Sequence, residues 1–299
     1  MNALSVVPRP AFDPTSALAG AEARMWRACD LPGPAGHPGD DPLDRAVAHH
    51  LAAGGSRVRM RLALAAGAEL GLDESDAAVL AGSCELLHNA SLVHDDVQDG
   101  DRERRGRPAV WVVFGADTAI LVGDLLIGAA FGLAAEVSPT CRPARLTRHL
   151  RRAVTTTARG QDADLRARER RISRIDDYEA IARAKSGPLL ALALELPLLA
   201  AGRERHQDTA HRAACAFGVA YQLVDDLADC GRDRSLNAVA VLQASGELSR
   251  EAARRDAAQR ARAHLGKARE LAARLPCGGV LDGPVLRLEA QLGQHASRP

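Results

Sequence analysis

The chain has 299 residues, 46% of them hydrophobic, which is enough for a sizeable core in one large domain or two ordinary ones. Its charge is balanced, with 39 Lys and Arg against 38 Asp and Glu, and it has only four Phe, two Trp and two Tyr. These figures argue against a bulk nucleic-acid binder and against an array of base-stacking aromatics. Ala, Leu and Arg are abundant instead, and this composition favours helices over a β-sandwich.

In chain order, the sequence predicts a disordered tail at residues 1–16 and a single all-α domain at residues 17–299. The tail is rich in proline and lacks the pattern of a signal peptide. A first helix at 17–29 leads into a connection at 31–41 that is rich in Pro and Gly. Residues 110–114 form the only compact β-like run. Further helices are expected at 44–53, 57–70, 74–98, 111–137, 142–168, 175–201, 207–228 and 249–274, with loops at 139–143 and 230–236.

Residues 118–137 are apolar enough to raise the question of a membrane span. Asp124 lies inside this segment, and a central aspartate costs about 2.5–3.5 kcal/mol on insertion scales. Gly123, Gly128 and Gly132 recur at a spacing that suits tight helix packing. We therefore expect a buried core helix rather than an integral membrane protein. The six scattered cysteines show no zinc-ligand spacing, which predicts reduced thiols and a cytoplasmic location.

Two acidic clusters of the form Asp-Asp-x-x-Asp each follow a strongly apolar stretch. On a helix, positions i and i+4 share a face, so the first and last aspartate of each cluster point the same way. Such carboxylates repel each other unless a cation lies between them, and Mg²⁺ prefers oxygen ligands. One cluster alone is equally well a solvated helix end, but two predict a site for Mg²⁺ and a diphosphate. The clusters are Asp95, Asp96 and Asp99, and Asp225, Asp226 and Asp229.

A basic loop, residues 100–108, follows the first cluster directly. Its arginines can pair bidentately with phosphate oxygens that a metal ion leaves free. The alternative is a surface loop in which they pair with Asp101 and Glu103. Lys185 and Lys267 are the only lysines in the chain, so a lysine inside a motif carries more information than usual.

Together these motifs resemble the trans-isoprenyl diphosphate synthases, the polyprenyl synthetases that include geranylgeranyl diphosphate synthases. The similarity spans residues 54–242 and keeps the family's order of motifs. It includes both aspartate-rich regions, the Gly-Gln-x-x-Asp-Leu that begins at Gly160, and a Lys-Ser-Gly that begins at Lys185. The resemblance implies a single-domain bundle of long helices around a central cavity, and a homodimer. It also implies a Mg²⁺-dependent prenyltransferase that condenses isopentenyl diphosphate with an allylic diphosphate.

The same resemblance implies a role for individual residues. Two or three Mg²⁺ ions grip the allylic diphosphate, and isopentenyl diphosphate attacks the carbocation left by ionisation. Arg104 and Lys185 clamp the diphosphate, and Gln161 and Gln222 lie near the reacting chain. The implied metal ligands are Asp95, Asp96, Asp99, Asp225, Asp226 and Asp229; the implied catalytic residues are Asp95, Asp96, Asp99, Lys185, Gln222, Asp225 and Asp226; and the implied substrate-binding residues are Arg59, His88, Arg104, Arg105, Gln161, Lys185, Ser186 and Gln222.

Two departures from the family pattern weaken the implied isopentenyl diphosphate site. The family's Gly-Gly-Lys-Arg-x-Arg-Pro reads GGSRVRM here, with Ser56 in place of the lysine. Losing one phosphate-binding cation weakens binding by ~1–3 kcal/mol, and Arg57 is a candidate to compensate. The loop after Asp229 is short and lacks the family's lysines, with Arg232 or Arg234 as candidate substitutes.

The residues just before Asp95 bear on product length. Ala90 and Ser91 stand about one turn below the metal site, where a bulky aromatic in this family stops chain growth. Two small residues therefore predict a C20 or longer all-trans product. Leu87 and Cys84 are candidates for a deeper wall.

Two other functions stay open. A class I terpene cyclase on the same scaffold would act on a prenyl diphosphate without isopentenyl diphosphate, and Ser56 and the short loop favour it. A non-catalytic partner subunit is the third hypothesis. Such a subunit is expected to lose aspartates, whereas this chain keeps all six.

Overall fold

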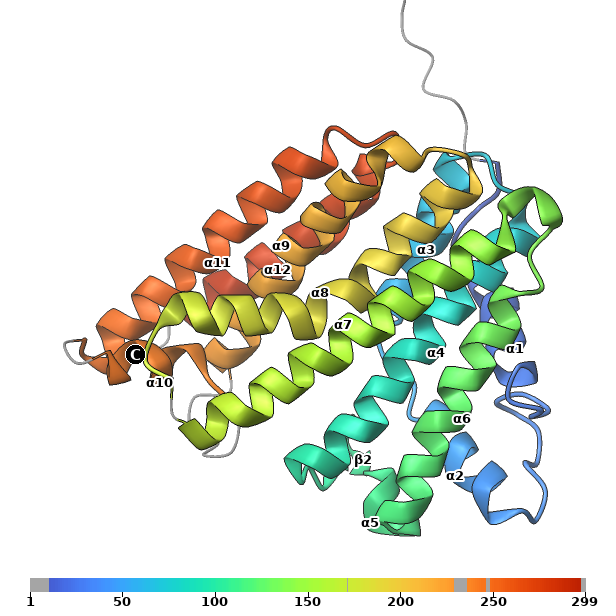
Figure 1. Cartoon of the computed structure of the whole chain (residues 1–299), viewed down its shortest axis with the longest axis horizontal. Coiled ribbons are helices and arrows are strands. Elements are labelled where there is room, and N and C mark those ends of the chain that lie inside the picture. Colours follow the sequence, from blue (N-terminus) through green and yellow to red (C-terminus); the bar gives the residue numbers. More distant parts are fainter. Residues whose placement is uncertain (1–10, 171, 229–235, 246–247, 297–299) are drawn as a thin grey trace, which may run out of the picture.

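The computed structural model describes residues 11–170, 172–228, 236–245 and 248–296. This part of the chain is all-α, with one short hairpin (Figure 1). Its elements are α1 (Ala17–Arg27), α2 (Pro42–Leu51), α3 (Val58–Glu69), α4 (Glu74–Asp99), β1 (Glu103–Arg104), β2 (Arg107–Pro108), α5 (Val110–Phe114), α6 (Ala116–Ala134), η1 (Pro139–Cys141), α7 (Pro143–Arg170), α8 (Ile175–Ala200), η2 (Glu204–His206), α9 (Gln207–Ala228), α10 (Ala238–Ala244), α11 (Arg250–Ala272), η3 (Gly278–Leu281) and α12 (Asp282–Ala296).

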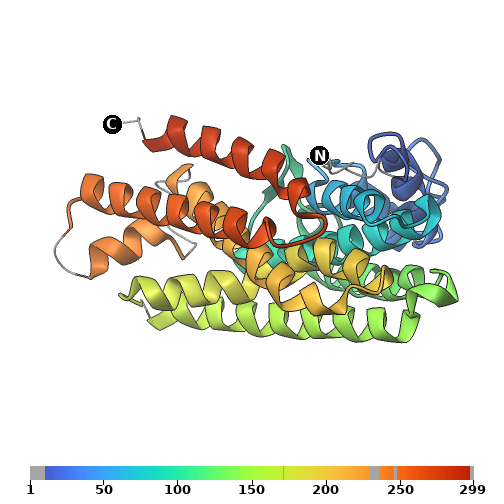
Figure 2. The ribbon, with the colours of Figure 1, turned by 90° about the horizontal axis from the view of Figure 1, so that it is seen from above.

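One contiguous hydrophobic core joins side chains from α1 through α12. Helix α8 is buried almost all around from Gly187 to Leu199, so it lies in the interior of the bundle. Helices α7 and α8 run antiparallel and side by side (Figure 1), and α12 lies on the face of the bundle opposite α7 (Figure 2). In this interior position α8 packs against α4, α7 and α9.

The end of α4 and the hairpin after it position the first acidic cluster. Helix α4 ends at Asp99 because Gly100 adopts a left-handed conformation with φ 69°. In the turn between β1 and β2, Arg105 and Gly106 both have positive φ, 55° and 73°, as a tight two-residue hairpin turn requires. The chain thereby folds back and places its arginines beside the last turn of α4.

The expected helices are present, with ends that differ by a few residues. The exception is the segment 111–137, which forms two helices, because Gly115 breaks it with φ 89° and ψ 158°. The β-like run at 110–114 is the short helix α5. Helices α10 and α12 and the hairpin were not predicted. Of the expected tail, residues 11–16 are described: Phe12 packs against the core, and the Ala11 amide donates to the Ala68 carbonyl.

Helix α6 is less buried than the sequence predicted. Val122 and Leu126 are buried, whereas Ile120 is 47% and Leu121 55% exposed. Within the described residues, α6 is the one helix long and apolar enough by composition to cross a membrane, and 33% of its apolar window is buried. The expectation of a buried core helix is therefore wrong for the outward face, because only one side of α6 packs on α4.

Candidate functional site

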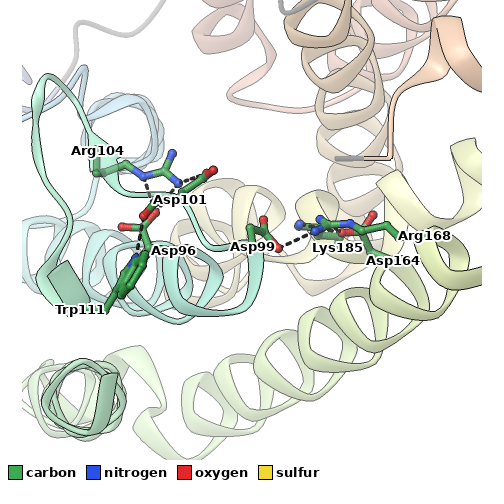
Figure 3. A network of polar contacts seen from close by, with 8 residues as sticks. All are labelled: Asp96, Asp99, Asp101, Arg104, Trp111, Asp164, Arg168 and Lys185. Carbon is green, nitrogen blue, oxygen red and sulfur yellow. Dashed lines mark hydrogen bonds and ion pairs between the residues drawn. The ribbon is translucent and has the colours of Figure 1, made fainter. Parts of the chain in front are cut away.

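Neighbouring aspartates of the first cluster point to different partners. Asp96 is buried and accepts a hydrogen bond of 2.8 Å from Arg104 Nε, while Arg104 also pairs with Asp101 at 3.2 Å (Figure 3). Asp99 lies in a separate network with residues of α7 and α8 (Figure 3). The last turn of α4 thus uses Asp96 to hold the hairpin and turns Asp99 toward the centre of the bundle.

The network around Asp99 joins three helices. Arg168 on α7 bonds to Asp99 at 2.8 Å and to Asp164, one turn earlier on its own helix, at 2.5 Å. Lys185 on α8 also binds Asp164, at 3.1 Å. Figure 3 shows these four side chains in one group. Asp164 therefore accepts hydrogen bonds from two cations.

Asp95 lies among charges of both signs. Burial raises the pKa of its carboxyl to about 6; Lys185 and Arg104 lower that pKa, and the charges of Asp99 and Asp164 raise it further. Several carboxylates close enough to disfavour one another's charge make a site that a cation would stabilise.

The second cluster shows the same division of roles. Asp225 is exposed at the surface of the site. Asp226 is buried and accepts hydrogen bonds from the Tyr178 hydroxyl at 2.6 Å, the Ala238 amide at 2.7 Å and the Gln222 amide at 3.3 Å. Burial raises the Asp226 pKa to about 6 against these hydrogen bonds. Asp226 thus ties α8, α9 and α10 together, and Asp229 lies outside the described residues.

The two clusters share neighbours. Burial raises the pKa of Tyr178, and the charges of Asp226, Asp164 and Asp225 raise it further. Since Asp164 is also a partner of the Arg168 that binds Asp99, both clusters border the same group of side chains. The convergence of all six aspartates stays a prediction, because Asp229 lies outside the described residues.

A cavity of about 350 Å³ opens beside the first cluster. Asp95 and Gln161 form part of its wall, and both amide atoms of Gln161 are buried without a hydrogen-bond partner in the described chain. Buried polar atoms without partners point to a ligand that satisfies them. The remaining walls are mostly apolar, and the full lining is Leu87, Ala90, Ser91, His94, Asp95, Gln98, Ile127, Val154, Thr157, Ala158, Gln161, Asp162, Leu165 and Leu189.

A second polar region gathers positive charge between α3, α4 and the hairpin. Burial lowers the pKa of His88 well below 6.5, and the charges of Arg59 and Arg105 lower it further. Arg59 Nε is buried without a partner among the described residues. Arg105 donates to the Gly54 carbonyl. Arginines gathered around a neutral histidine are suited to binding an anion. Its neighbour Tyr221 feels the charges of Asp225, Arg59 and Arg105, so this region adjoins the second cluster.

Arg57 does not take the place of the missing lysine. It is buried, donates to Glu22 at 2.9 Å and to the Leu51 carbonyl at 3.3 Å, and pairs with the buried Glu85 at 3.4 Å. The expected compensation for Ser56 is therefore wrong, because these partners hold the guanidinium inside the fold. Ser56 itself is exposed.

Three residues of the site were not predicted: Asp164 and Arg168 on α7, and Tyr178 on α8. Asp164 stands inside the Gly-Gln-x-x-Asp-Leu motif, and the spacing of Asp164 and Arg168 is that of a helical ion pair, which were usable signals. Tyr178 gave none. The predicted Ser186 is half-buried on α8 directly after Lys185.

The oxygen donors present fit Mg²⁺, which prefers carboxylates and keeps open positions. Among the described residues, no three His, Cys, Asp or Glu side chains are gathered as they stand to hold a metal ion. Asp96 and Asp226 have protein partners, and Asp99 pairs with Arg168. Asp95 lines the cavity and Asp225 is exposed at the end of α9, so both remain candidate ligands together with Asp99.

Comparison with known proteins shows which sequences this chain is similar to. The chain is 36% identical over 199 residues to the geranylgeranyl diphosphate synthase of Mycobacterium tuberculosis, covering 62% of this chain and 57% of that protein. It is 32% identical over 191 residues to the short chain isoprenyl diphosphate synthase of Methanocaldococcus jannaschii, covering 64% and 58%. These matches span less than two thirds of either relative.

Solved structures extend the similarity over nearly the whole chain. The geranylgeranyl pyrophosphate synthetase of Geoglobus acetivorans superposes with a TM-score of 0.76 at 25% identity, covering 95% of this chain and 99% of that one. The polyprenyl synthetase of Streptomyces coelicolor superposes with a TM-score of 0.73 at 26% identity, with the same coverage. The sequence profile of the family described as Polyprenyl synthetase matches residues 40–238. The chain belongs to the polyprenyl synthetase family.

Proposed function

We propose that this protein is a Mg²⁺-dependent prenyltransferase that condenses isopentenyl diphosphate with an allylic diphosphate to give an all-trans prenyl diphosphate of C20 or longer. The observation that carries this proposal is the cavity, which places Asp95 and Gln161 beside apolar walls such as Ile127 and Leu189. An anionic head and an isoprenoid tail fit such a site. The relatives named geranylgeranyl diphosphate synthase and short chain isoprenyl diphosphate synthase support the same activity.

Asp95, Asp99 and Asp225 would hold the metal ions. A Mg²⁺ ion held there would supply Lewis-acid chemistry that offsets the charge of the departing diphosphate. The positive charges of Arg104 and Lys185 lower the pKa of Asp95, so both side chains act on the same site. Their N–H groups would donate hydrogen bonds to the phosphate oxygens that the metal ions leave free. Asp96 and Asp226, whose carboxylates already bind protein donors, act mainly by fixing Arg104 and the junction of α8 and α10.

The second substrate would bind in the positive region formed by Arg59, His88 and Arg105. With a pKa well below 6.5, His88 is neutral at pH 7 and donates a hydrogen bond rather than a charge. The buried amide of Gln161 lies in the cavity wall, where its oxygen can face a developing carbocation. The apolar walls exclude water, so the second substrate's double bond reacts instead. Ser186 and Gln222 complete the predicted binding residues.

The decisive experiment is a product assay with purified protein, Mg²⁺, labelled isopentenyl diphosphate and an allylic primer, analysed by mass spectrometry. A labelled prenyl diphosphate of C20 or longer supports the proposal. Ala90 and Ser91 line the cavity beside Leu87, and their small size supports the proposed length. Asp95→Ala and Asp225→Ala are expected to lower turnover at least ~100-fold, as loss of transition-state charge stabilisation does. The exposed Asp117→Ala is the matched control.

The terpene cyclase remains the alternative that the exposed Ser56 supports. A hydrocarbon or alcohol formed without isopentenyl diphosphate would establish it and contradict the prenyltransferase. The prenyl synthase names of the relatives do not favour it.

We also propose that the protein is a cytoplasmic homodimer. The exposed apolar side chains Val113, Ile120 and Leu121 on α5 and α6 offer a surface for a second copy of the chain. The five described cysteines are free thiols, as a reducing compartment favours. The balanced charge gives no reason to expect nucleic acid as a partner.

A further inference from the structure

Arg168 occupies a carboxylate that the proposed function needs for metal binding. It reaches from α7 to Asp99, the last residue of α4, with an N–O distance of 2.8 Å. Both side chains are only 18% exposed, so this pair is shielded from solvent. An ion pair that is mostly buried is stronger than one at the surface, since water screens it less.

The rest of the network allows Arg168 to leave Asp99. Its second partner is Asp164, which is 7% exposed and lies one turn before it on the same helix. Lys185 also binds Asp164, at 3.1 Å, so Asp164 keeps a cation whatever Arg168 does. Arg168 is therefore anchored by Asp164 while its contact with Asp99 can be exchanged.

Arg168 also has a hydrogen-bond donor to spare. Its Nε is buried and has no hydrogen-bond partner among the described residues. Once released from Asp99, the guanidinium would have both its Nε and its Nη1 group without a protein acceptor. A buried donor without a partner is costly unless another state of the protein satisfies it.

Building on the proposed function, we propose that Arg168 is an internal counter-ion that competes with the divalent cation for Asp99. Without metal, Arg168 neutralises Asp99 and joins the end of α4 to α7. Metal binding at Asp95 and Asp99 requires Arg168 to give up Asp99, because a guanidinium and a divalent cation repel each other at one carboxylate. Arg168 then stays bound to Asp164, beside Lys185.

The test measures metal binding to the whole protein without substrate. Mn²⁺, a spin-active substitute for Mg²⁺, is titrated into chelator-treated protein, and free Mn²⁺ is measured by electron paramagnetic resonance. Arg168→Gln is expected to lower the dissociation constant about three- to tenfold, because the competing charge-assisted hydrogen bond is gone. Arg168→Lys keeps the charge but cannot bridge both carboxylates in the same way. Its dissociation constant for Mn²⁺ is expected to lie between those of the wild type and of Arg168→Gln.

Arg166→Gln is the matched control. Arg166 lies on the same helix and pairs with Asp162 four residues before it at 3.0 Å, but it is 63% exposed and does not reach Asp99. Its substitution is expected to leave Mn²⁺ binding unchanged. Adding Asp99→Asn to Arg168→Gln is expected to remove the gain, which locates the competition at Asp99.

The proposal is overturned if Arg168→Gln and Arg168→Lys bind Mn²⁺ no more tightly than the wild type, or if neither binds it. A condensation assay of the wild type separates this inference from the function. Product formed by the wild type without any gain in the variants overturns only the counter-ion proposal. Tighter Mn²⁺ binding by Arg168→Gln in a protein whose wild type forms no prenyl diphosphate overturns only the prenyltransferase proposal.

Discussion

At the scale of single residues, adjacent aspartates divide the work of the site. Consecutive positions on a helix point about 100° apart, so Asp95 and Asp96 cannot face the same ligand directly. Asp96 and Asp226 turn inward to protein donors, and Asp225 is exposed. The second aspartate of each motif therefore holds neighbouring elements in place through its protein donors.

Tyr178 tests the structural part of this division. Tyr178→Phe removes the hydroxyl that donates to Asp226 at 2.6 Å and leaves a buried carboxylate with one donor fewer. We expect the free energy of unfolding to fall by ~1–3 kcal/mol. Urea denaturation measures it. Tyr221→Phe is the matched control, because Tyr221 is 53% exposed, and an unchanged stability is expected there. Equal losses in both variants would contradict the role of Tyr178.

His50 makes the stability depend on pH. It is 3% exposed and contacts Asn89 at 3.1 Å, and burial together with the charge of Arg105 lowers its pKa from 6.5 to about 3. In the unfolded chain His50 binds a proton near pH 6.5, whereas in the folded chain it stays neutral until the pH approaches 3. The contribution of neutral His50 to stability is therefore present above pH 6.5 and is lost as the pH falls toward 3.

The variant His50→Gln isolates this effect. Below pH 6.5, the unfolding free energy of the wild type is expected to fall relative to the variant by about 1.4 kcal/mol per pH unit. Urea denaturation across the acidic range checks the slope. His37→Gln, at an exposed position, is the control and should run parallel to the wild type. Parallel curves for all three proteins would contradict the assignment.

At the scale of elements, close packing of α7 on α8 brings the site residues together. A Cβ added at Gly160 would lie 2.4 Å from the Ala184 carbonyl carbon and from the Lys185 amide nitrogen. The glycine of the Gly-Gln-x-x-Asp-Leu motif thus allows two backbones to touch, and this approach places Asp164 within 3.1 Å of Lys185. The motif glycine is needed for packing, and the residues after it are needed for the site.

Gly160→Ala is expected to lower stability by about 1–3 kcal/mol, because the methyl group meets backbone that cannot rotate away. Thermal or urea denaturation measures the change. Gly266→Ala on α11 is the control: nothing lies within 4 Å of its added Cβ, and a helical alanine is expected to stabilise by up to ~1 kcal/mol. A neutral effect at Gly160 would show that α7 and α8 separate easily.

At the scale of the whole molecule, α6 has one face in the core and an apolar face outside it. Its buried residues pack on α4, whose last turn carries the first acidic cluster. A second copy on the outward face would stiffen the helix pair that carries Asp95. In the proposed homodimer, the packing of α6 on α4 would link the subunit interface to the site.

Leu121→Arg tests that surface. Leu121 is 55% exposed, and a charge there is expected to turn a dimer into monomers in sedimentation velocity. Leu286→Arg on α12, 59% exposed in the free chain, is the matched control and should leave the dimer intact. A wild type that sediments as a monomer would contradict the homodimer.

The sequence by itself determined the helical class and most helix positions, and it predicted which residues carry metal and phosphate chemistry. Helical periodicity and short motifs are local, so they can be read without the fold. It missed the break at Gly115, because a glycine in an apolar helical run is also compatible with an unbroken helix.

Only the tertiary structure decided the partners of these residues. In the folded chain Arg57 pairs with Glu22 and Glu85, and Arg168 pairs with Asp99. Asp226 accepts a hydrogen bond from Tyr178. Each pair joins residues far apart in the chain, and the burial that makes these pairs strong exists only once the helices have packed. Local patterns predicted which groups can do chemistry, and packing determined which partners those groups have.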